Sequence, residues 1–264
     1  MRPRLAILPA TLVLCAYGQI PAPDANERKA IVFRMQEAAL AYAGRLQNFT
    51  CTQFLTRSAG NSPGGPHWKR LDTQESVIEY VNRKEHSEIV KVNGETIDPA
   101  KRIKRGPYFA PGGEFGSMLQ KIFDRQAQAE FEWDHDEASS CLRTYVFRYN
   151  VRQATSTDVI QADADRVQLG HHGMVWADCF TGAVMRFRIE TDIGEIARSG
   201  RRVAIGSRLE VRYAPVTIGT QEFLLPQTAV ETSLFYKTWT KLDIRFEQYR
   251  KYDANSVIEF GEDK

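Results

Sequence analysis

The stretch Arg208-Leu-Glu-Val-Arg-Tyr213 indicates the fold class, because charged and apolar side chains alternate in it at every position. Successive side chains of a β-strand point to opposite faces, so this alternation is typical of a strand with one wet and one dry face. Met185-Arg-Phe-Arg-Ile189 repeats the pattern, and Thr144-Tyr-Val-Phe-Arg-Tyr149 places three aromatic rings together on one face. The chain is therefore expected to build a sheet whose dry face is rich in large rings.

Segments of this kind follow one another along the chain and are bounded by Gly, Pro, Asn and Asp. About eleven strands are predicted, at 49–57, 68–81, 85–92, 129–134, 142–152, 166–178, 183–192, 203–213, 222–236, 239–250 and 255–260. Asn93-Gly94 and Thr181-Gly182 are tight-turn signals between successive segments. Neighbouring strands are therefore expected to be antiparallel.

Two helices interrupt this pattern. Asn26 can cap a helix that runs to about Gln47, with apolar residues recurring at helical spacing. A shorter helix is predicted from Glu114 to Phe123, after Pro111-Gly-Gly113. We therefore expect an α+β fold that is mainly β. It has an N-terminal helix, and a short helix that would cover a sheet face or close an opening.

A strongly curved antiparallel sheet of this size has more apolar concave surface than two helices can easily fill. Either the sheet closes on its own side chains, or it keeps a pocket for a ligand. The rings and apolar side chains expected on the dry face and on the short helix are the candidate ligand-binding residues, with ordinary core packing as the alternative. They are Trp133, Tyr145, Phe147, Tyr149, Trp176 and Phe187 on the sheet and Phe115, Met118 and Ile122 on the plug helix.

The first residues resemble a secretory signal peptide. Met1-Arg-Pro-Arg4 is basic, the run from Leu5 to Tyr17 is apolar, and Ala16-Tyr17-Gly18 offers small residues for cleavage. We expect a signal peptide at 1–18 and a single exported domain at 19–264. Lipidation at Cys15 is the alternative. No apolar stretch reaches the roughly 20 residues that a membrane-spanning helix needs.

The charges are nearly balanced, with 35 Lys and Arg against 33 Asp and Glu in the 264 residues. This balance argues against a general nucleic-acid surface. One segment is locally basic and is followed by aromatic residues, so it could touch an anionic membrane or a partner, although a solvated loop is the alternative. Its residues are Lys101, Arg102, Lys104, Arg105, Tyr108 and Phe109.

Three cysteines remain once the leader is removed, an odd number for an oxidising compartment. Cys141 opens one predicted strand and Cys179 closes another, so a Cys141–Cys179 disulfide is predicted, which leaves Cys51 as the single thiol. No C-x-x-C occurs, which argues against structural zinc and thioredoxin chemistry.

No catalytic motif stands out. The histidines do not form H-E-x-x-H, and no G-x-S-x-G is present. His171-His172 is interpreted as a turn or edge pair, and Gly112-Gly-Glu-Phe-Gly116 as a helix entrance with Glu114 in its first turn. We therefore expect a protein that is not an enzyme, with no metal or cofactor.

Several segments resemble those of bacterial secreted proteins. The exported leader, Gln47-Asn-Phe-Thr-Cys51, the hairpin from Gly173 to Arg186, and Val211-Arg-Tyr-Ala-Pro-Val216 running into Leu224-Leu-Pro226 are similar to the LolA, LolB and RseB-like lipoprotein-localisation superfamily. Over nearly the whole mature chain there is a closer likeness to an uncharacterised family of secreted soil-bacterial proteins. That likeness is carried by Gly113-Glu-Phe-Gly116, Phe131-Glu-Trp133 and Phe246-Glu-Gln-Tyr-Arg250.

The resemblance implies a strongly curved antiparallel half-barrel of about eleven strands, plugged by helices on its concave face. It also implies a periplasmic or secreted protein that holds a hydrophobic ligand: a lipid, an acyl chain or a lipoprotein. The alternative is an envelope module that binds or senses another protein and has no lipid ligand.

Overall fold

The structure is a computed structural model that describes residues 22–62, 67–98, 113–139, 142–162, 165–198, 201–235 and 237–252. Four sequence-based expectations fall outside these ranges: the leader at 1–18, the basic segment at 101–109, Cys141, and the strand at 255–260.

Helices are few in the described ranges. The helix α1 spans Ala25–Arg45 and α2 spans Ser117–Phe123, with two 3₁₀ turns at Arg125–Ala127 and Gln153–Thr155. The strands are β1 Phe49–Gly60, β2 Lys69–Val81, β3 Lys84–Val92, β4 Glu95–Thr96, β5 Glu130–Ser139, β6 Leu142–Val151, β7 Val159–Ala162, β8 Asp165–Gln168, β9 His171–Asp178, β10 Val184–Thr191, β11 Gly194–Arg198, β12 Arg201–Ile218, β13 Gln221–Phe235 and β14 Thr238–Lys251.

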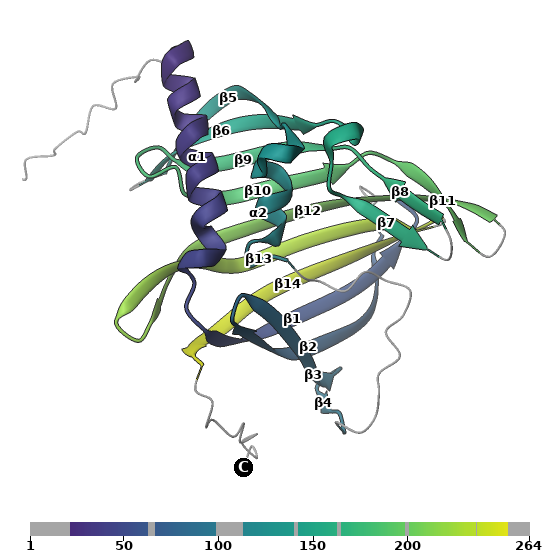
Figure 1. The fold of residues 1–264 in the computed structure, drawn as a ribbon. Helices are drawn as coiled ribbons and strands as arrows, with labels where there is room; N and C mark the ends of the chain where they lie inside the picture. The colour runs from purple at the N-terminus through teal and green to yellow at the C-terminus, as the bar shows by residue number, and fades with distance from the viewer. Residues whose placement is uncertain are drawn as a thin grey trace, which may run out of the picture.

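In the described part of the chain, twelve strands form one antiparallel sheet in the order β4-β3-β2-β1-β14-β13-β12-β10-β9-β6-β5, with β11 added beside β12. The two ends of this order do not join, so the sheet stays open. The strands β7 and β8 form a separate two-stranded sheet. Figure 1 shows the large sheet curving behind α1 and α2, which lie across one of its faces. The predicted mainly-β half-barrel is confirmed.

The N-terminal helix starts slightly earlier than predicted. Its cap is Asp24, whose carboxylate accepts the backbone N–H groups of Asn26 and Glu27, while the Glu27 carboxylate reaches back to the N–H of Asp24. This reciprocal capping box satisfies backbone N–H groups at the start of the helix. Asn26 lies inside the first turn, so it is not the cap. Ile31, Met35 and Ala39 face the sheet and are buried.

One predicted strand is divided in two. The segment 166–178 leaves the large sheet at Leu169 and Gly170, so β8 pairs with β7 while β9 pairs with β6 and β10. Gly170 sits where a Cβ atom would lie 2.5 Å from a carboxylate oxygen of Asp192 and close to the carbonyl oxygen of Val151. A side chain here would need Asp192 to move. The chain crosses between two sheets at this point, although the alternation of residues along 166–178 predicted one continuous strand.

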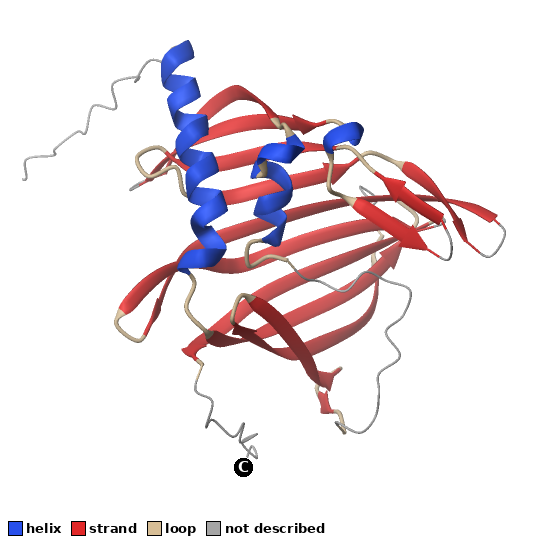
Figure 2. Ribbon diagram, in the orientation of Figure 1, coloured by secondary structure: helices blue, strands red, loops and turns tan. Residues whose placement is uncertain are grey.

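The core lies between the helices and the concave face of the sheet, and Figure 2 shows both helices on this face. Phe115, just before α2, packs against three rings from different strands: Phe49 at 5.2 Å, Phe246 at 5.4 Å and Tyr80 at 5.9 Å between centroids. Tyr42 of α1 meets Tyr213 of β12 edge to face at 5.6 Å. Burial of these rings is the main contribution that fixes both helices to the sheet.

Gly116 lets α2 approach α1. Its φ is +128°, and a Cβ atom there would lie 3.1 Å from the Cβ of Ala43 and 3.2 Å from the ring of Tyr42. Gly94 also has a positive φ, of +85°, but nothing lies within 4 Å of a Cβ added there.

Gly116→Ala should therefore destabilise the protein more than the matched change Gly94→Ala, by about 1–3 kcal/mol in the free energy of unfolding. Urea unfolding followed by near-ultraviolet circular dichroism measures the difference. Equal losses in the two variants would contradict the close approach of α2 to α1.

Candidate functional site

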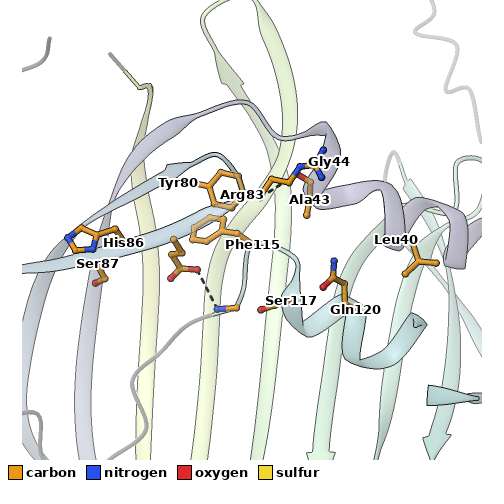
Figure 3. Close-up of a pocket in the computed structure, with 12 residues that line it drawn as sticks. Leu40, Ala43, Gly44, Tyr80, Arg83, His86, Ser87, Phe115, Ser117 and Gln120 are labelled. Atoms are coloured by element: carbon orange, nitrogen blue, oxygen red, sulfur yellow. Dashed lines mark hydrogen bonds between the residues drawn. The ribbon is translucent and has the colours of Figure 1, made fainter. Parts of the chain in front are cut away.

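A cavity of about 650 Å³ opens where the C-terminal half of α1, the β2–β3 hairpin and the start of α2 meet (Figure 3). Its volume lies within the range of roughly 300–1,000 Å³ that is usual for small-molecule sites. The lining residues are Leu40, Ala43, Gly44, Tyr80, Arg83, Glu85, His86, Ser87, Gly113, Phe115, Ser117 and Gln120.

Most of the exposed lining of the cavity is polar, and two rings lie buried in its wall. Tyr80 and Phe115 are buried, and Figure 3 shows their rings next to each other. Arg83, His86 and Gln120 are exposed. An opening of this kind is suited to an amphiphilic molecule, because its apolar part can contact the rings while its polar part stays near charged and hydrogen-bonding groups.

The hairpin between β2 and β3 positions one side of this site. Asn82 and Arg83 have φ values of +53° and +63°, as expected for the two central residues of a tight hairpin turn whose twist matches the strands. The side-chain oxygen of Asn48 accepts the backbone N–H of Asn82 at 3.0 Å. Tyr80 pairs directly with Glu85 across the turn, which puts both side chains on the concave face.

Most of the ligand-binding residues predicted from the sequence lie in the core rather than at this cavity. Phe147, Tyr149 and Phe187 of the sheet and Ile122 of α2 are almost completely buried. Trp133, Tyr145 and Met118 are partly buried and pack against the same core. Of the nine predicted residues, Phe115 lines the cavity. Contact of the others with a ligand stays a prediction.

Trp176 lies on the opposite face of the sheet from the position predicted for it. Val175 pairs with both Phe147 and Phe187, so its neighbour Trp176 must point away from the concave face. The guanidinium of Arg186 stacks 3.9 Å from the Trp176 ring, and the indole N–H donates to Glu137 at 2.9 Å. The assignment of Trp176 to the concave pocket was wrong because strand register, which the sequence does not give, decides the face.

A buried carboxyl lies beside the cavity. Glu114 stands between the cavity-lining residues Gly113 and Phe115, is 1% exposed, and has one carboxyl oxygen without a hydrogen-bond partner. Burial, together with a smaller effect of the nearby carboxyl of Glu85, raises the pKa of Glu114 to about 8. Burial also raises the pKa of Glu85, which accepts the backbone N–H of Gly113 at 3.4 Å (Figure 3).

Glu114 is held in place by its surroundings rather than by helix formation. The helix α2 begins at Ser117, so Glu114 precedes it and does not belong to its first turn as the sequence suggested. The hydroxyl of Tyr213 donates to the backbone carbonyl of Glu114 at 2.7 Å. A glutamate flanked by glycines and a phenylalanine, in a segment whose neighbours are apolar, is the sequence signal that could have indicated a buried carboxyl.

A third carboxyl with a raised pKa lies on the same face of the sheet. Glu231 of β13 pairs with Leu209 and Leu242, whose side chains are in the core, and burial raises its pKa while the hydroxyl of Ser233 donates to it at 2.7 Å. The concave face is therefore not uniformly apolar.

His171 and His172 differ in their environments. His172 is exposed, as expected for an edge residue, whereas His171 is 1% exposed and neither ring nitrogen has a hydrogen-bond partner. Burial lowers the pKa of His171. Its ring meets Tyr149 edge to face at 5.7 Å, so His171 belongs to the core, which corrects the interpretation of both residues as a turn or edge pair.

The cysteine prediction is not tested, because Cys141 lies outside the described residues. Cys51 is buried in β1, and burial raises the pKa of its thiol. Within the described ranges, no three His, Cys, Asp or Glu side chains are grouped so that they could hold a metal ion. In the same ranges, none of the helices combines the length and the hydropathy needed to cross a membrane.

The chain matches no protein-family model and no curated protein sequence. Several solved structures are similar to it in fold, and three of them are described here. An outer membrane lipoprotein-sorting protein domain from Vibrio parahaemolyticus is 12% identical, with a TM-score of 0.45 and coverage of 88% of this chain and 95% of that one. A LolA superfamily protein from Nitrosomonas europaea is 11% identical, with a TM-score of 0.34 and coverage of 85% and 93%. A DUF1329 family protein from Desulfovibrio piger is 11% identical, with a TM-score of 0.37 and coverage of 90% and 96%.

The raised pKa of Glu114 predicts that the stability of the folded protein depends on pH. Because the folded-state pKa of Glu114 lies above the ordinary value of 4.5, the folded protein holds this proton more tightly than the unfolded chain does. The stabilising effect is complete below about pH 4.5 and is lost as the pH rises through about 8.

Glu114→Gln should remove that dependence, so that the drop in unfolding free energy between pH 5 and pH 9 becomes smaller by about 2–4 kcal/mol. Urea unfolding at a series of pH values measures the slope. Glu88→Gln, which changes an exposed carboxyl of β3, is the control and should leave the slope as it is. An unchanged slope in Glu114→Gln would show that the carboxyl is solvated.

Proposed function

We propose that this protein is a non-enzymatic, exported binding protein that holds a hydrophobic ligand in the half-barrel. The ligand is a lipid, an acyl chain or the acylated end of a lipoprotein. The observation that carries the proposal is the cavity of about 650 Å³ at the edge of the covered concave face, with buried rings in its wall and polar groups at its rim.

The helix α2 contributes Ser117 and Gln120 to the cavity and buries Leu119, Ile122 and Phe123 in the core. It has seven residues, and it is tied to its surroundings by the side chain of Gln36, which donates to the carbonyl of Phe123 at 3.0 Å, and by the ion pair of Lys121 with Asp158 at 2.8 Å. A chain longer than the cavity would displace α2 and reach Phe147 and Phe187. On this proposal the core residues predicted as ligand contacts become contacts in the loaded protein.

The proposed location follows from the leader. Residues 1–18 have the order of basic, apolar and small residues that directs export, and the folded domain at 19–264 would be released into the periplasm or secreted. The absence of recognised catalytic motifs in the sequence supports a binding role.

Filling the cavity should weaken ligand binding. Gly44→Trp introduces a large ring at the cavity wall, where an added Cβ atom meets only the guanidinium of Arg83 at 3.7 Å. The dissociation constant for dansyl-undecanoate, followed by fluorescence, should rise by about tenfold or more, equivalent to about 1.4 kcal/mol.

Ala30→Trp is the matched control, because it adds the same ring to an exposed position of the same helix. Its affinity should equal that of the unmodified protein. Equal binding by Gly44→Trp and Ala30→Trp would contradict the assignment of the cavity. If the unmodified protein binds no fatty acid, and native mass spectrometry finds no lipid in it, the carrier function is wrong.

An envelope protein-interaction or sensor module is the alternative, and exposed aromatic residues favour it. Phe180, in the β9–β10 turn, is 84% exposed and Phe33 of α1 is 60% exposed. The same turn lies against α1, since a Cβ atom at Gly182 would be 2.7 Å from the backbone of Arg34. A pull-down from envelope extracts separates the two functions: a sensor should retain a specific protein through Phe180, without extractable lipid.

A further inference from the structure

We propose that the cavity binds the anionic head group of an amphiphile through the guanidinium of Arg83, with the acyl chain against the rings of Tyr80 and Phe115. This inference rests on the proposed function and specifies its ligand class: an acyl chain that ends in a carboxylate or a phosphate. Both groups accept hydrogen bonds from two N–H groups of one guanidinium, so they share the chemistry that this site supplies.

Arg83 lines the cavity, and the hairpin that carries it fixes its backbone. Its φ of +63° belongs to the tight β2–β3 turn, and the side chain of Asn48 accepts the N–H of the preceding residue, Asn82, at 3.0 Å. A Cβ atom at Gly44 would lie 3.7 Å from a terminal nitrogen of the Arg83 guanidinium. Figure 3 shows Arg83 beside Gly44 and Ala43, near the end of α1. The missing side chain at Gly44 therefore leaves the guanidinium room against α1, at the edge of the cavity.

The guanidinium of Arg83 has open donor positions. Among the residues that the structure describes, no carboxylate forms an ion pair with it and no acceptor takes a hydrogen bond from it. On the other face of the sheet, by contrast, Arg188 and Arg212 each donate to the carboxylate of Glu210 at 3.0 Å. A guanidinium stays charged in proteins and has five N–H donors. Arg83 is thus a permanent positive charge at the cavity, with its donors available to a ligand.

Three neutral side chains add donors around the same cavity: Ser87 of β3, and Ser117 and Gln120 of α2. In the described part of the chain, none of the three makes a side-chain hydrogen bond. Figure 3 shows Ser117 and Gln120 close together on α2. Hydroxyl and amide groups donate to carboxylate and phosphate oxygens, so these side chains would complete the binding of a head group held by Arg83.

Glu85 is the acid among the lining residues, and one of its oxygens already accepts the backbone N–H of Gly113 at 3.4 Å. Burial raises the pKa of Glu85, because the charged form of the carboxyl is disfavoured there. The next residue, His86, pairs with Glu79, so its ring lies on the opposite face of β3 from the Glu85 carboxyl. Arg83 therefore supplies the permanent charge of the cavity, and that charge favours an anion.

Four probes with the same twelve-carbon chain test the inference: laurate, dodecyl phosphate, dodecanol and dodecylamine. Binding of each to the unmodified protein at about pH 8 is measured by displacement of a neutral fluorescent acyl probe, at concentrations too low for micelles to form. Laurate and dodecyl phosphate should each bind on the order of tenfold more tightly than dodecanol, and dodecylamine should bind most weakly. The tighter of the two anions distinguishes the source: a free fatty acid for laurate, and a phospholipid for dodecyl phosphate.

Arg83→Gln should remove the preference for the anions and leave dodecanol binding as it is, because the charged contact alone is lost. Arg83→Lys keeps the charge without the paired N–H groups, so it should keep part of the preference. Lys84→Gln is the matched control: it removes an exposed cation from the next position of the same hairpin, outside the cavity lining, and should keep the whole preference. If Arg83→Gln weakens all four probes alike, the role of Arg83 is structural and the inference is wrong.

Salt gives an independent readout. Raising the NaCl concentration from about 20 mM to about 500 mM screens an exposed ion pair, so the ratio of laurate affinity to dodecanol affinity should fall severalfold. In Arg83→Gln this ratio should be close to one at both salt concentrations. Dodecanol or dodecylamine binding as tightly as laurate, or an anion preference that survives in Arg83→Gln, would overturn the inference while leaving the proposed function intact. Failure of all four probes to bind would instead contradict the proposed function.

Discussion

The packing of α1 and α2 on the concave face of the open sheet is the constraint on which the rest of the structure depends. A curved sheet that does not close must cover its apolar face with other elements, because exposed apolar area of that size is unfavourable in water. Phe115 and Tyr42 bring the two helices onto that face through ring contacts with β1, β2, β12 and β14. The candidate cavity lies at the edge of the region that α1 and α2 cover.

The packing of α2 on the sheet also explains why a polar group is buried near the cavity. The loop that leads into α2 must turn sharply at Gly113 and Gly116 to place Phe115 among the rings, and Glu114 is carried inward between them. Its carboxyl then lies in a region of low polarity close to Glu85, which accounts for its raised pKa. Packing of one aromatic residue and burial of one acid are thus parts of the same arrangement.

Sequence patterns predicted the positions of most strands. They predicted correctly for some strands, but not for all, which side chains face the core. Leu209, Val211 and Tyr213 are buried as the alternation indicated. The pattern failed where the backbone departs from a regular strand. Alternation with Met185, Phe187 and Ile189 on the dry face would put Val184 on the wet face, but the register of β10 against β9 shifts between Val184 and Arg186, and Val184 is buried. A bulge of this kind changes which side chains share a face, and it depends on the partner strand rather than on the strand's own residues.

The sequence by itself determined the local features of this protein: antiparallel strands with a wet and a dry face, one long amphipathic helix, and a short helix after a glycine-containing turn. These follow from periodicity and turn chemistry among residues close together in the chain. The tertiary structure alone decided that Trp176 points away from the concave face, that His171 is buried, and that Glu114 is buried next to residues that line a cavity. Those outcomes depend on strand register and on contacts between segments far apart in the chain, and no local pattern specifies either.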